Sequence, residues 1–586
     1  MKRAIIVSVG LLCAVTAAAQ EEDAAIKAAM YINGASSAEE LEADEVERLQ
    51  VIGKVRVNAP GRNARAILSE YQLAALEDYR RQCGDILSWE ELALVDGFGK
   101  EAVEALKPYL FLWSDNLPGA VDTVSHFRAD LLVRTTEKNL GTKLKAGGKL
   151  WQVAGAARSK SWGSKEYDWT ASAEFGNGRW SLLVGNFNVR YGQGLGIWSG
   201  FSMSSLSTID AFIKRPTGIR PVCSFTPSQH RGLAGEYHLG RWSLAAFADL
   251  QRTAGLHASY VTLRSQLGLT LLPNRASTDF ALNYKGIDFV GELSASLPNK
   301  TSPSASGTPS SSSSGTPSPS SSGLSRGSHV AAILATKFKI NDIKLSLQTR
   351  AIPSAFSGKK NGEYGAAAGA QWKSPQWQQL KGHEGFGSSV SKHVVSLTAD
   401  ASLLPIPQKD PNRKQLRIYG LWQWQMSETL ALDTKFTGRY RTWEPSRSDI
   451  RLDVKYSNGQ WFGATRIESD FCDGPGVLSY LEISHKGDQT GSSNGARLQG
   501  WAAYFRIGAF STSGWASRIY CYERDAPGTF TVPAYSGQGL TTSLYGTLKA
   551  RLGSHLRAKL CLRGTCVLKK DTKPSPSLHF QIQIDI

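Results

Sequence analysis

The 586-residue sequence contains no apolar run, beyond a short one at its N-terminus, that approaches the length of a membrane-spanning helix. Such a helix needs about 18 or more consecutive apolar residues. Hydrophobic residues make up 41% of the chain and the mean hydropathy is −0.26, which excludes a polytopic helical membrane protein. Charged residues at 20% and aromatic residues at 10% exclude a mostly disordered chain.

The sequence also lacks the motifs that mark a catalytic or metal site. It has no H-E-x-x-H, C-x-x-C, G-x-S-x-G or P-loop, and its ten histidines are scattered without metal-ligand spacing. We therefore expect no enzymatic function, no cofactor and no metal. A barrel hydrolase remains an alternative, because such enzymes assemble their sites from strand residues far apart in sequence.

Cysteine is scarce, with seven residues in the whole chain, too few for a disulfide framework. Cys561 and Cys566 are the one close pair outside the N-terminal segment. A two-residue turn at Arg563-Gly564 would place them opposite each other across a hairpin and allow a bridge. On one continuous strand they would remain two free thiols.

Charge is distributed unevenly along the chain. Lys and Arg total 67 against 50 Asp and Glu, a net charge of +17. Between Glu21 and Leu112 there are 18 acidic and 10 basic residues, a net of −8, whereas Trp113–Ile586 has 32 and 55, a net of +23. Glycine (57) and tryptophan (16) are plentiful, as is typical of a turn-rich β protein. An acidic N-terminal part therefore precedes a long basic β region.

The first 19 residues have the form of a cleaved secretory signal peptide. Met1–Arg3 is charged, Ala4–Val15 is apolar, and Ala17–Ala19 supplies the small residues that signal peptidase requires. Cys13 follows Leu12, which is too large for the usual lipobox, so we expect no lipid anchor. Residues 20–52 are predicted to form an acidic helical lead.

Three helices are predicted between residues 69 and 108. Ser69-Glu-Tyr-Gln72 and Ser88-Trp-Glu-Glu91 are capping boxes that begin the first two. The first helix ends at Gly84, which suits the position after a helix C-terminus. The third begins at Gly99 and ends near Pro108.

The connection before the third helix, Val95-Asp-Gly-Phe-Gly99, has the h-x-G-h-G pattern of a helix-hairpin-helix. Its glycines permit a tight turn, and the free N–H groups of the next helix can hold a phosphate without reading base sequence. Together with the ordered motifs at 79–84 and 88–92, residues 53–112 resemble the tandem helix-hairpin-helix domain of ComEA-like competence DNA receptors. The resemblance implies DNA-phosphate contact at four residues: Gly97, Phe98, Gly99 and Lys100.

The charge around this hairpin supports a second interpretation. Asp96, Glu101 and Glu104 surround it, and Lys100 is the only nearby cation. Non-specific DNA binding depends on cations that neutralise phosphates. A helix-hairpin-helix used for packing, for docking a periplasmic protein or for plugging the pore is therefore the main hypothesis, and DNA binding is the alternative.

Residues 122–586 are predicted to form an all-β transmembrane antiparallel barrel of about 18–20 strands, with an even number preferred. Segments of alternating apolar and polar residues are separated by turn residues, and a soluble β-sandwich or propeller is the competing fold. The last segment, Leu578–Ile586, alternates most clearly. The other clear segments are Trp180–Val189, Trp242–Leu250, Val330–Phe338, Leu416–Gln425, Leu430–Tyr440, Ile450–Tyr456, Trp461–Ile467, Leu498–Ile507 and Thr541–Lys549. Asn177-Gly178, Leu239-Gly240 and Asn458-Gly459 have the form of hairpin turns, the first two predicted to be periplasmic.

One interruption of the β pattern carries a motif: Tyr191–Gly200 contains G-Q-G-L and is followed by Lys214-Arg215 and Gly218–Pro221. With the upstream hairpin, it resembles a family of Gram-negative outer-membrane proteins that combine a periplasmic helix-hairpin-helix domain with a barrel carrying this loop. The resemblance implies location without assigning a reaction. The cations could line a lumen constriction for anions or pair with barrel carboxylates. The residues concerned are Gln193, Lys214, Arg215, Arg220 and Arg231.

A second interruption, Thr301–Ser328, is nearly all Ser, Pro, Gly and Thr and is predicted to be a disordered loop. The sequence thus predicts a non-enzymatic outer-membrane barrel with a periplasmic helix-hairpin-helix module, involved in transport or envelope assembly through protein docking. Sequence-independent DNA binding or uptake and an outer-membrane hydrolase are the alternatives. Expected partners are outer-membrane lipid, the barrel-insertion machinery, a periplasmic protein and DNA.

Overall fold

The computed structural model describes most of the chain. The described residues are 18–41, 43–51, 54–61, 64–65, 67–114, 127–177, 179–199, 206–225, 230–251, 253–297, 329–357, 362–374, 392–406, 410, 412–427, 429–487, 496–527, 529–552, 556–570 and 572–585. The predicted signal peptide up to residue 17 and the Ser/Pro segment 301–328 lie outside these residues. Among the helices described, none is long and apolar enough to cross a membrane.

The β region is a closed antiparallel barrel. The main sheet has 26 strands, and without the short inner strands β8 and β9 the wall has 24. Each wall strand pairs with its neighbour in sequence, and β7 pairs with β10 across the inner segment. β3 pairs with β30 from Asp130↔Asp585 to Thr135↔Phe580, which closes the ring. The soluble sandwich or propeller is therefore excluded.

The wall strands are β3 (Arg128–Thr135), β4 (Leu140–Gly147), β5 (Trp151–Ser159), β6 (Tyr167–Gly176), β7 (Trp180–Tyr191), β10 (His230–Leu239), β11 (Trp242–Asp249), β12 (Ala254–Val261), β13 (Ser265–Leu272), β14 (Arg275–Tyr284), β15 (Ile287–Ser296), β16 (Val330–Ile340), β17 (Ile343–Ile352), β18 (Glu363–Lys373), β19 (Lys392–Leu403), β20 (Lys414–Gln425), β21 (Leu430–Arg441), β22 (Glu444–Asn458), β23 (Trp461–Phe471), β24 (Pro475–Gly487), β25 (Ala496–Thr512), β28 (Gln538–Leu552), β29 (Leu556–Lys569) and β30 (Ser575–Asp585).

The predicted strand number of about 18–20 is wrong, although each clearly alternating segment lies in a strand to within one residue. The shortfall comes from strands such as β4, β5 and β18. Their sequences are mostly Gly, Ala and polar residues, as in the Glu363–Lys373 run EYGAAAGAQWK. Small side chains give little contrast between the two faces of a strand, so alternation alone does not reveal such strands.

Cys561 and Cys566 both lie on continuous β29 as free thiols, so no hairpin forms between them.

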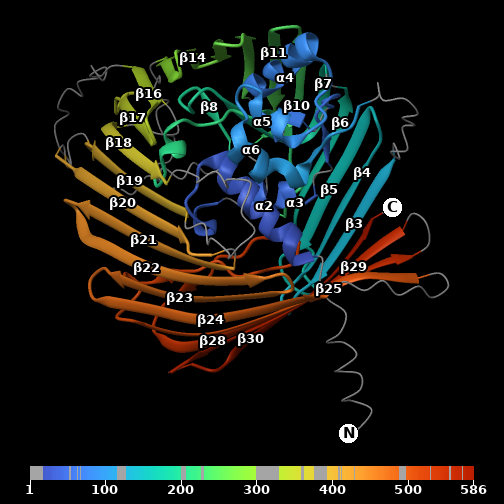
Figure 1. Cartoon of the computed structure of the whole chain (residues 1–586), viewed down its shortest axis with the longest axis vertical. Helices are drawn as coiled ribbons and strands as arrows, with labels where there is room; N and C mark the ends of the chain where they lie inside the picture. Colours follow the sequence, from blue (N-terminus) through green and yellow to red (C-terminus); the bar gives the residue numbers. More distant parts are fainter. Residues whose placement is uncertain are drawn as a thin grey trace, which may run out of the picture.

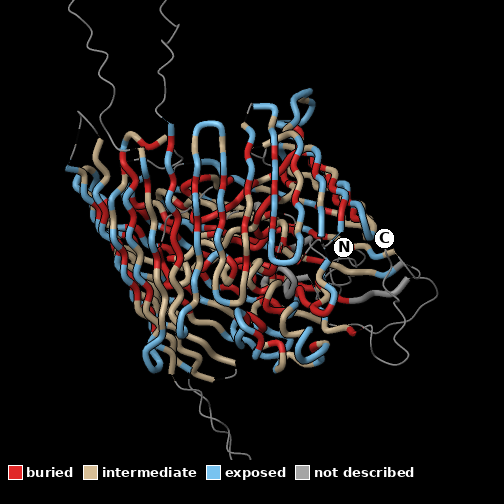
Figure 2. Tube along the Cα trace, turned by 90° about the horizontal axis from the view of Figure 1, so that it is seen from above, coloured by how far each residue is buried: buried red, intermediate tan, exposed pale blue. Residues whose placement is uncertain are grey.

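Side chains alternate between the two faces of the wall, as the period of a strand requires. On β24, for example, Leu481 and Ile483 are 60% and 47% exposed, whereas Glu482 and Ser484 between and beside them are buried. Figure 2 shows this alternation of buried and exposed positions along strands that run from one rim to the other. The outer face is therefore apolar and the inner face polar, as in an outer-membrane barrel.

The two rims differ. At the terminal end, where β3 begins and β30 ends, most turns are short, including those at Gly240 and Gly459 with φ of 58° and 54°. At the loop end lie the longest connections that the structure describes. Exposed aromatic residues occupy both ends of the strands, as in the girdles of membrane barrels; at the terminal end they include Trp180, Trp242, Tyr284 and Trp461.

Two of the loop-end connections fold back into the barrel. The first inner loop follows β7 and contains β8 (Ile197–Trp198), η4 (Ile209–Phe212) and β9 (Gly218–Pro221). The second inner loop follows β25 and contains β26 (Ile519–Tyr520) and β27 (Ala534–Tyr535).

The residues before the barrel form a helical body that we call the plug (18–114). Its elements are α2 (Ala18–Asn33), η1 (Ala38–Glu40), α3 (Ala43–Val51), β1 (Val55–Arg56), α4 (Glu70–Cys83), α5 (Trp89–Leu94), α6 (Gly99–Leu106), η3 (Lys107–Tyr109) and β2 (Leu110–Phe111). The predicted capping box at Ser69 and Gln72 begins α4, and Gly84 ends it with a φ of 91°. Ser88 caps α5 by accepting from the Glu91 N–H at 3.1 Å.

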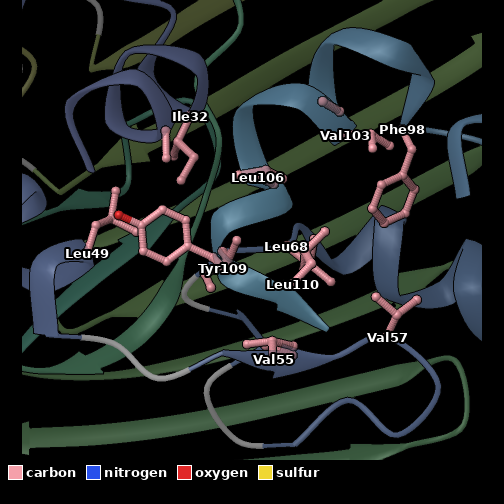
Figure 3. Close-up of a cluster of buried hydrophobic side chains, with 14 of the residues drawn as sticks. Ile32, Leu49, Val55, Val57, Leu68, Phe98, Val103, Leu106, Tyr109 and Leu110 are labelled. Atoms are coloured by element: carbon pink, nitrogen blue, oxygen red, sulfur yellow. The ribbon is translucent and has the colours of Figure 1, made fainter. Parts of the chain in front are cut away.

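The plug has one hydrophobic core, which includes Ile32 and Leu49 from the predicted lead and Leu68, Phe98 and Leu106 from the predicted hairpin domain (Figure 3). A parallel pair of short strands, β1 and β2, joins the two ends of the hairpin part. The two predicted segments, 20–52 and 53–112, therefore pack as one body.

The plug lies inside the ring of strands rather than beside it (Figure 1). This arrangement differs from a helical module standing in the periplasm and corresponds to the alternative in which the helical part plugs the pore. Long-range ion pairs hold the helices against the inner wall, and sequence patterns along one strand or helix carry no information about such pairs. The lumen is occupied by the chain's own N-terminal part.

Candidate functional site: the acidic plug and the basic lumen

The short helix η1 contacts the wall through three ion pairs. Glu39 accepts from Arg466 Nη1 at 2.7 Å and pairs with Arg451 Nη1 at 3.2 Å. Glu40 pairs with Lys435 Nζ at 2.7 Å. The side chains of all five residues are 10–13% exposed, so these pairs are largely shielded from water. Removing one partner of such a pair is costly because the other charge stays buried.

The three wall cations face the lumen because of strand phase. Arg451 lies between Ile450 and Leu452, which are 49% and 38% exposed on the lipid side. Successive side chains on a strand point to opposite faces, so Arg451 points inward. Asp453, two residues along, binds both Arg451 Nε at 3.0 Å and Arg466 Nε at 2.6 Å and holds the two guanidinium groups in place.

The two η1 carboxyl groups are held ionised. Burial alone would raise the pKa of Glu39, but Arg466 and Arg451 outweigh it and hold that pKa well below its ordinary value. For Glu40 the pKa is also lowered, because Lys435 and hydrogen bonds from Lys435, Ser207 and Ser36 outweigh burial. Both side chains therefore carry a negative charge in the docked plug at neutral pH.

The next helix, α3, forms similar ion pairs with wall strands on the other side of the lumen. Glu47 pairs with Lys143 Nζ of β4 at 2.7 Å and accepts from Ser224 Oγ at 3.2 Å. Glu45 pairs with Arg190 of β7. These four charged side chains are 6–11% exposed. In η1 and α3 alike, the plug supplies the acid and the wall supplies the base.

Helices α4 to α6 are held more loosely. Asp78 lies 3.9 Å from Arg241 Nη2, whose side chain is 48% exposed. Glu101 of α6 pairs with Lys344 Nζ at 3.2 Å and with Lys373, and its side chain is 48% exposed. A cavity of about 160 Å³ separates α4 from the wall at β10–β12.

Glu70, at the start of α4, borders this cavity and forms no ion pair with a wall residue that the structure describes. It accepts from Ser243 Oγ at 3.3 Å and Ser259 Oγ at 3.2 Å. Burial raises its pKa, and the attraction of Arg65 offsets only part of that rise. The α4 half of the plug therefore contains a buried acid that is poorly matched by the wall.

The first inner loop is fastened to the wall by the carboxylate of Glu292. The N–H groups of Gln193, Leu195 and Gly196 donate to it at 2.6, 3.0 and 2.7 Å, and Ser277 Oγ donates at 2.5 Å. Gly192 has a φ of 62°, and a Cβ there would lie 2.8 Å from the carboxylate. The G-Q-G-L motif thus permits backbone to wrap a carboxylate that belongs to the protein itself.

The five loop residues singled out from the sequence have different surroundings. Gln193 joins two segments of the first inner loop: its Nε2 donates to Lys214 O at 3.1 Å and its Oε1 accepts from Lys214 N at 2.9 Å. Lys214 Nζ lies 4.8 Å from the Trp198 ring centre. Arg215 donates to Gln72 of the plug.

The two remaining arginines lie by the wall. Arg220 pairs with Glu236 of β10 at 3.2 Å. Arg231 stacks over Trp169 at 4.1 Å. The structure therefore brings Gln193, Lys214 and Arg215 together, with Arg215 in contact with the plug, and leaves Arg220 and Arg231 at the wall.

The predicted DNA-contact residues lie between α5 and α6. Gly97 and Gly99 have φ of 79° and 70°. Gly97 O accepts from Gln72 Nε2 at 2.7 Å, and a Cβ at Gly97 would meet the Tyr71 ring at 2.7 Å. Phe98 is buried in the plug core, whereas Gly99 and Lys100 are exposed.

The sequence interpretation missed the wall cations that contact η1 and α3 of the plug: Lys143, Arg190, Lys435, Arg451 and Arg466. For Lys435, Arg451 and Arg466 strand phase was the available signal, because they alternate with apolar residues inside predicted segments. Lys143 lies on β4, which the sequence pattern did not reveal. Within the described residues, no group of three or more His, Cys, Asp or Glu side chains is placed to hold a metal ion.

Comparison with known proteins gives similarity to solved barrels alone. No family model matches the chain. No curated protein matches it. Among solved structures, OccAB3 of Acinetobacter baumannii and the outer membrane protein OpdK of Pseudomonas aeruginosa each align over 78% of this chain and 98% of theirs, with 8% identity and a TM-score of 0.29. The translocation pore of the P pilus usher PapC aligns over the same shares, with 8% identity and a TM-score of 0.34. The strand order of the barrel is established by the register of this chain's own strands.

Proposed function

We propose that this chain is a non-enzymatic outer-membrane β-barrel, acting in transport or envelope assembly, whose lumen is closed by its own N-terminal plug. The observation that carries the proposal is the matched charge at the plug–wall contact. Glu39, Glu40, Glu45 and Glu47 of the plug meet basic residues of the wall in buried ion pairs. A transported solute then passes only when the plug shifts or leaves.

Conductance of the full chain in planar lipid bilayers tests the proposal. The wild-type barrel should be closed, and Glu47→Lys should open it, because two lysines would then face each other at a buried contact. We expect a loss of about 3 kcal/mol, which is roughly a hundredfold rise in the open fraction.

The swap Glu47→Lys with Lys143→Glu is the matched control, because it restores an ion pair of opposite polarity at the same place. It should close the barrel again. Equal conductance in all three proteins would contradict a role of the plug in closing the lumen.

The proposed location follows from the apolar outer face and its aromatic girdles. The protein should fractionate with the outer membrane and migrate differently on gels before and after heating, because a closed hydrogen-bonded barrel resists detergent. Recovery in the soluble periplasmic fraction would contradict this proposal. Lipid and the barrel-insertion machinery are then its first partners.

The helix-hairpin-helix interpretation of α5 and α6 supports a second candidate, sequence-independent DNA contact at Gly97–Lys100. Exposed Gly99 and Lys100 favour it. Glu101, in the first turn of α6, weighs against it, because it brings negative charge to the helix N-terminus and is engaged with Lys344. Docking of a periplasmic protein on the same exposed side of the plug is the competing role.

Filter binding of duplex DNA to the full chain in detergent distinguishes these roles. If the hairpin binds DNA, affinity should fall with salt at a shallow slope of roughly −1 to −3, and Asp96→Lys should strengthen binding. Binding by Asp96→Lys without binding by the wild type would show that the hairpin can accept phosphate but is not used for it.

A further inference from the structure

Three arginines lie directly opposite one another on three adjacent wall strands. Arg417 of β20 is the register partner of Arg439 of β21, and Arg439 is the register partner of Arg447 of β22. These strands lie side by side in the wall (Figure 1). We call the three residues the arginine row. Like charges placed directly opposite on neighbouring strands destabilise a sheet, so this arrangement calls for a compensating charge.

The arginine row faces the lumen. Lys435, four residues before Arg439 on β21, reaches the plug, and Arg451, four residues after Arg447 on β22, does so as well. Side chains four residues apart on a strand share a face. Arg417, as the register partner of Arg439, points to the same side.

The protein itself compensates the row only in part. Arg447 Nε pairs with Asp470 at 2.6 Å. Arg417 Nη2 donates to Gln415 Oε1 at 3.3 Å. Arg439 makes no hydrogen bond or ion pair with any residue that the structure describes, and its Nε is buried without an acceptor. A buried donor without a partner is costly.

Two nearby acids are engaged with other arginines, and a third, Asp449 of β22, hydrogen-bonds Thr437. Asp400 is the register partner of Arg417 but pairs with Arg350 at 2.7 Å. Glu444 pairs with Arg441 at 2.5 Å. The central guanidinium therefore keeps its hydrogen-bonding capacity for a group that the described chain does not supply.

The row is placed where a solute would meet it. β21 ends at Arg441 and β22 begins at Glu444, both at the loop end, and the Glu444 side chain is 45% exposed. The plug contact at Lys435 lies four residues deeper along β21. Water and small solutes therefore approach the row from the loop end while the plug is docked.

We propose that the arginine row is a binding site for an oxyanion, the phosphate or carboxylate group of a small solute entering from the loop end, with Arg439 as its central ligand. Guanidinium forks bind such groups in a bidentate manner, and several cations converging on one anion favour a polyvalent one. The site does not depend on whether the plug closes the lumen.

Titration of the full chain in detergent with inorganic pyrophosphate at low salt tests the site by calorimetry. Arg439→Gln should weaken binding about tenfold or more, because one charged hydrogen-bonded ligand is lost. The same variant should raise the temperature of heat modification without ligand, since it relieves the repulsion in the row. Pyrophosphate should raise that temperature in the wild type.

Arg158→Gln is the matched control. Arg158 lies on β5, one residue from the loop-end terminus of that strand, and pairs with Asp168 at 3.4 Å, so its replacement removes the same charge from an already compensated site. It should leave pyrophosphate affinity unchanged. A second titration with citrate in place of pyrophosphate shows whether the site binds carboxylate groups, phosphate groups or both. Absence of binding of both anions to the wild type, or equal losses in the two variants, would overturn the site.

Discussion

The two halves of the plug are held in the lumen in different ways. In the lead half, η1 and α3 place four carboxylates on buried wall cations, with side chains 6–13% exposed. In the hairpin half, α4 and α6 reach the wall through a 3.9 Å contact at Asp78 and a half-exposed pair at Glu101. Burial removes the screening by water that weakens exposed pairs. The lead half is thus the anchor, and the hairpin half is the part that can separate from the wall first.

Glu39→Gln tests the anchor and should have the largest effect. It leaves Arg466 and Arg451 with Asp453 as their shared carboxylate partner. We therefore expect plug docking to lose about 3 kcal/mol, the lower end of the range for breaking a buried ion pair. The open fraction in bilayers should rise roughly a hundredfold. A closed barrel in this variant would show that η1 is not the anchor.

Acid should release the same anchor. The docked pKa of Glu39 is lowered well below its ordinary value, and that of Glu40 is lowered too. Docking therefore gains stability from these carboxylates above the ordinary Glu pKa of about 4.3 and loses it as the pH falls through the lowered values. Conductance should stay low from pH 7 to about 5 and rise below about 4.5. Glu39→Gln should show a shallower rise.

Glu70→Gln should have a smaller effect, and in the opposite direction. Burial raises the pKa of Glu70, so its charge opposes docking at neutral pH and protonation relieves that cost. Glutamine keeps the hydrogen-bonding capacity toward Ser243 and Ser259 without the charge. The open fraction should fall by roughly twofold to fivefold, the scale of one hydrogen-bond exchange. A marked rise would mean that Glu70 is a second anchor.

Glu101→Gln makes the same chemical change as Glu39→Gln in the hairpin half and should have the smallest effect. Exposed pairs contribute about 0.2–1 kcal/mol, so the open fraction should change by less than about fivefold. An effect as large as that of Glu39→Gln would abolish the distinction between the two halves. High salt should reduce the Glu101 effect further, because exposed pairs are screened.

Much of the fold was predictable because it depends on local periodicity. Strands with large alternating side chains, such as β22 and β30, were identified, and so were the helix starts at Ser69 and Ser88, where short-range hydrogen bonds decide the structure. The number of strands was not, because strands rich in Ala and Gly, such as β18, give little contrast between their faces.

The candidate site was harder to predict. The motif around Gln193 is visible in the sequence, but Glu292, which its N–H groups bind, lies about 100 residues further along the chain. The opposite net charges of residues 21–112 and 113–586 are visible in the sequence as well. These charges favour docking because Arg451 and Arg466 lie at the same depth in the lumen as Glu39. That depth is determined by the assembled barrel and cannot be read from the sequence of any one strand.

The seam between β3 and β30 has a consequence for how quickly the protein can fold. It joins the first and last wall strands, and Arg134 contacts His579 across it at a separation of 445 residues. Contacts that close so long a segment form late, because chain entropy opposes them until the intervening strands are paired. Until β30 is in place, β3 presents an unpaired edge that can recruit strands of other chains. The edge of β3 therefore needs protection while the chain is synthesised and crosses the periplasm. Once β30 has paired with β3, the closed barrel no longer needs that protection.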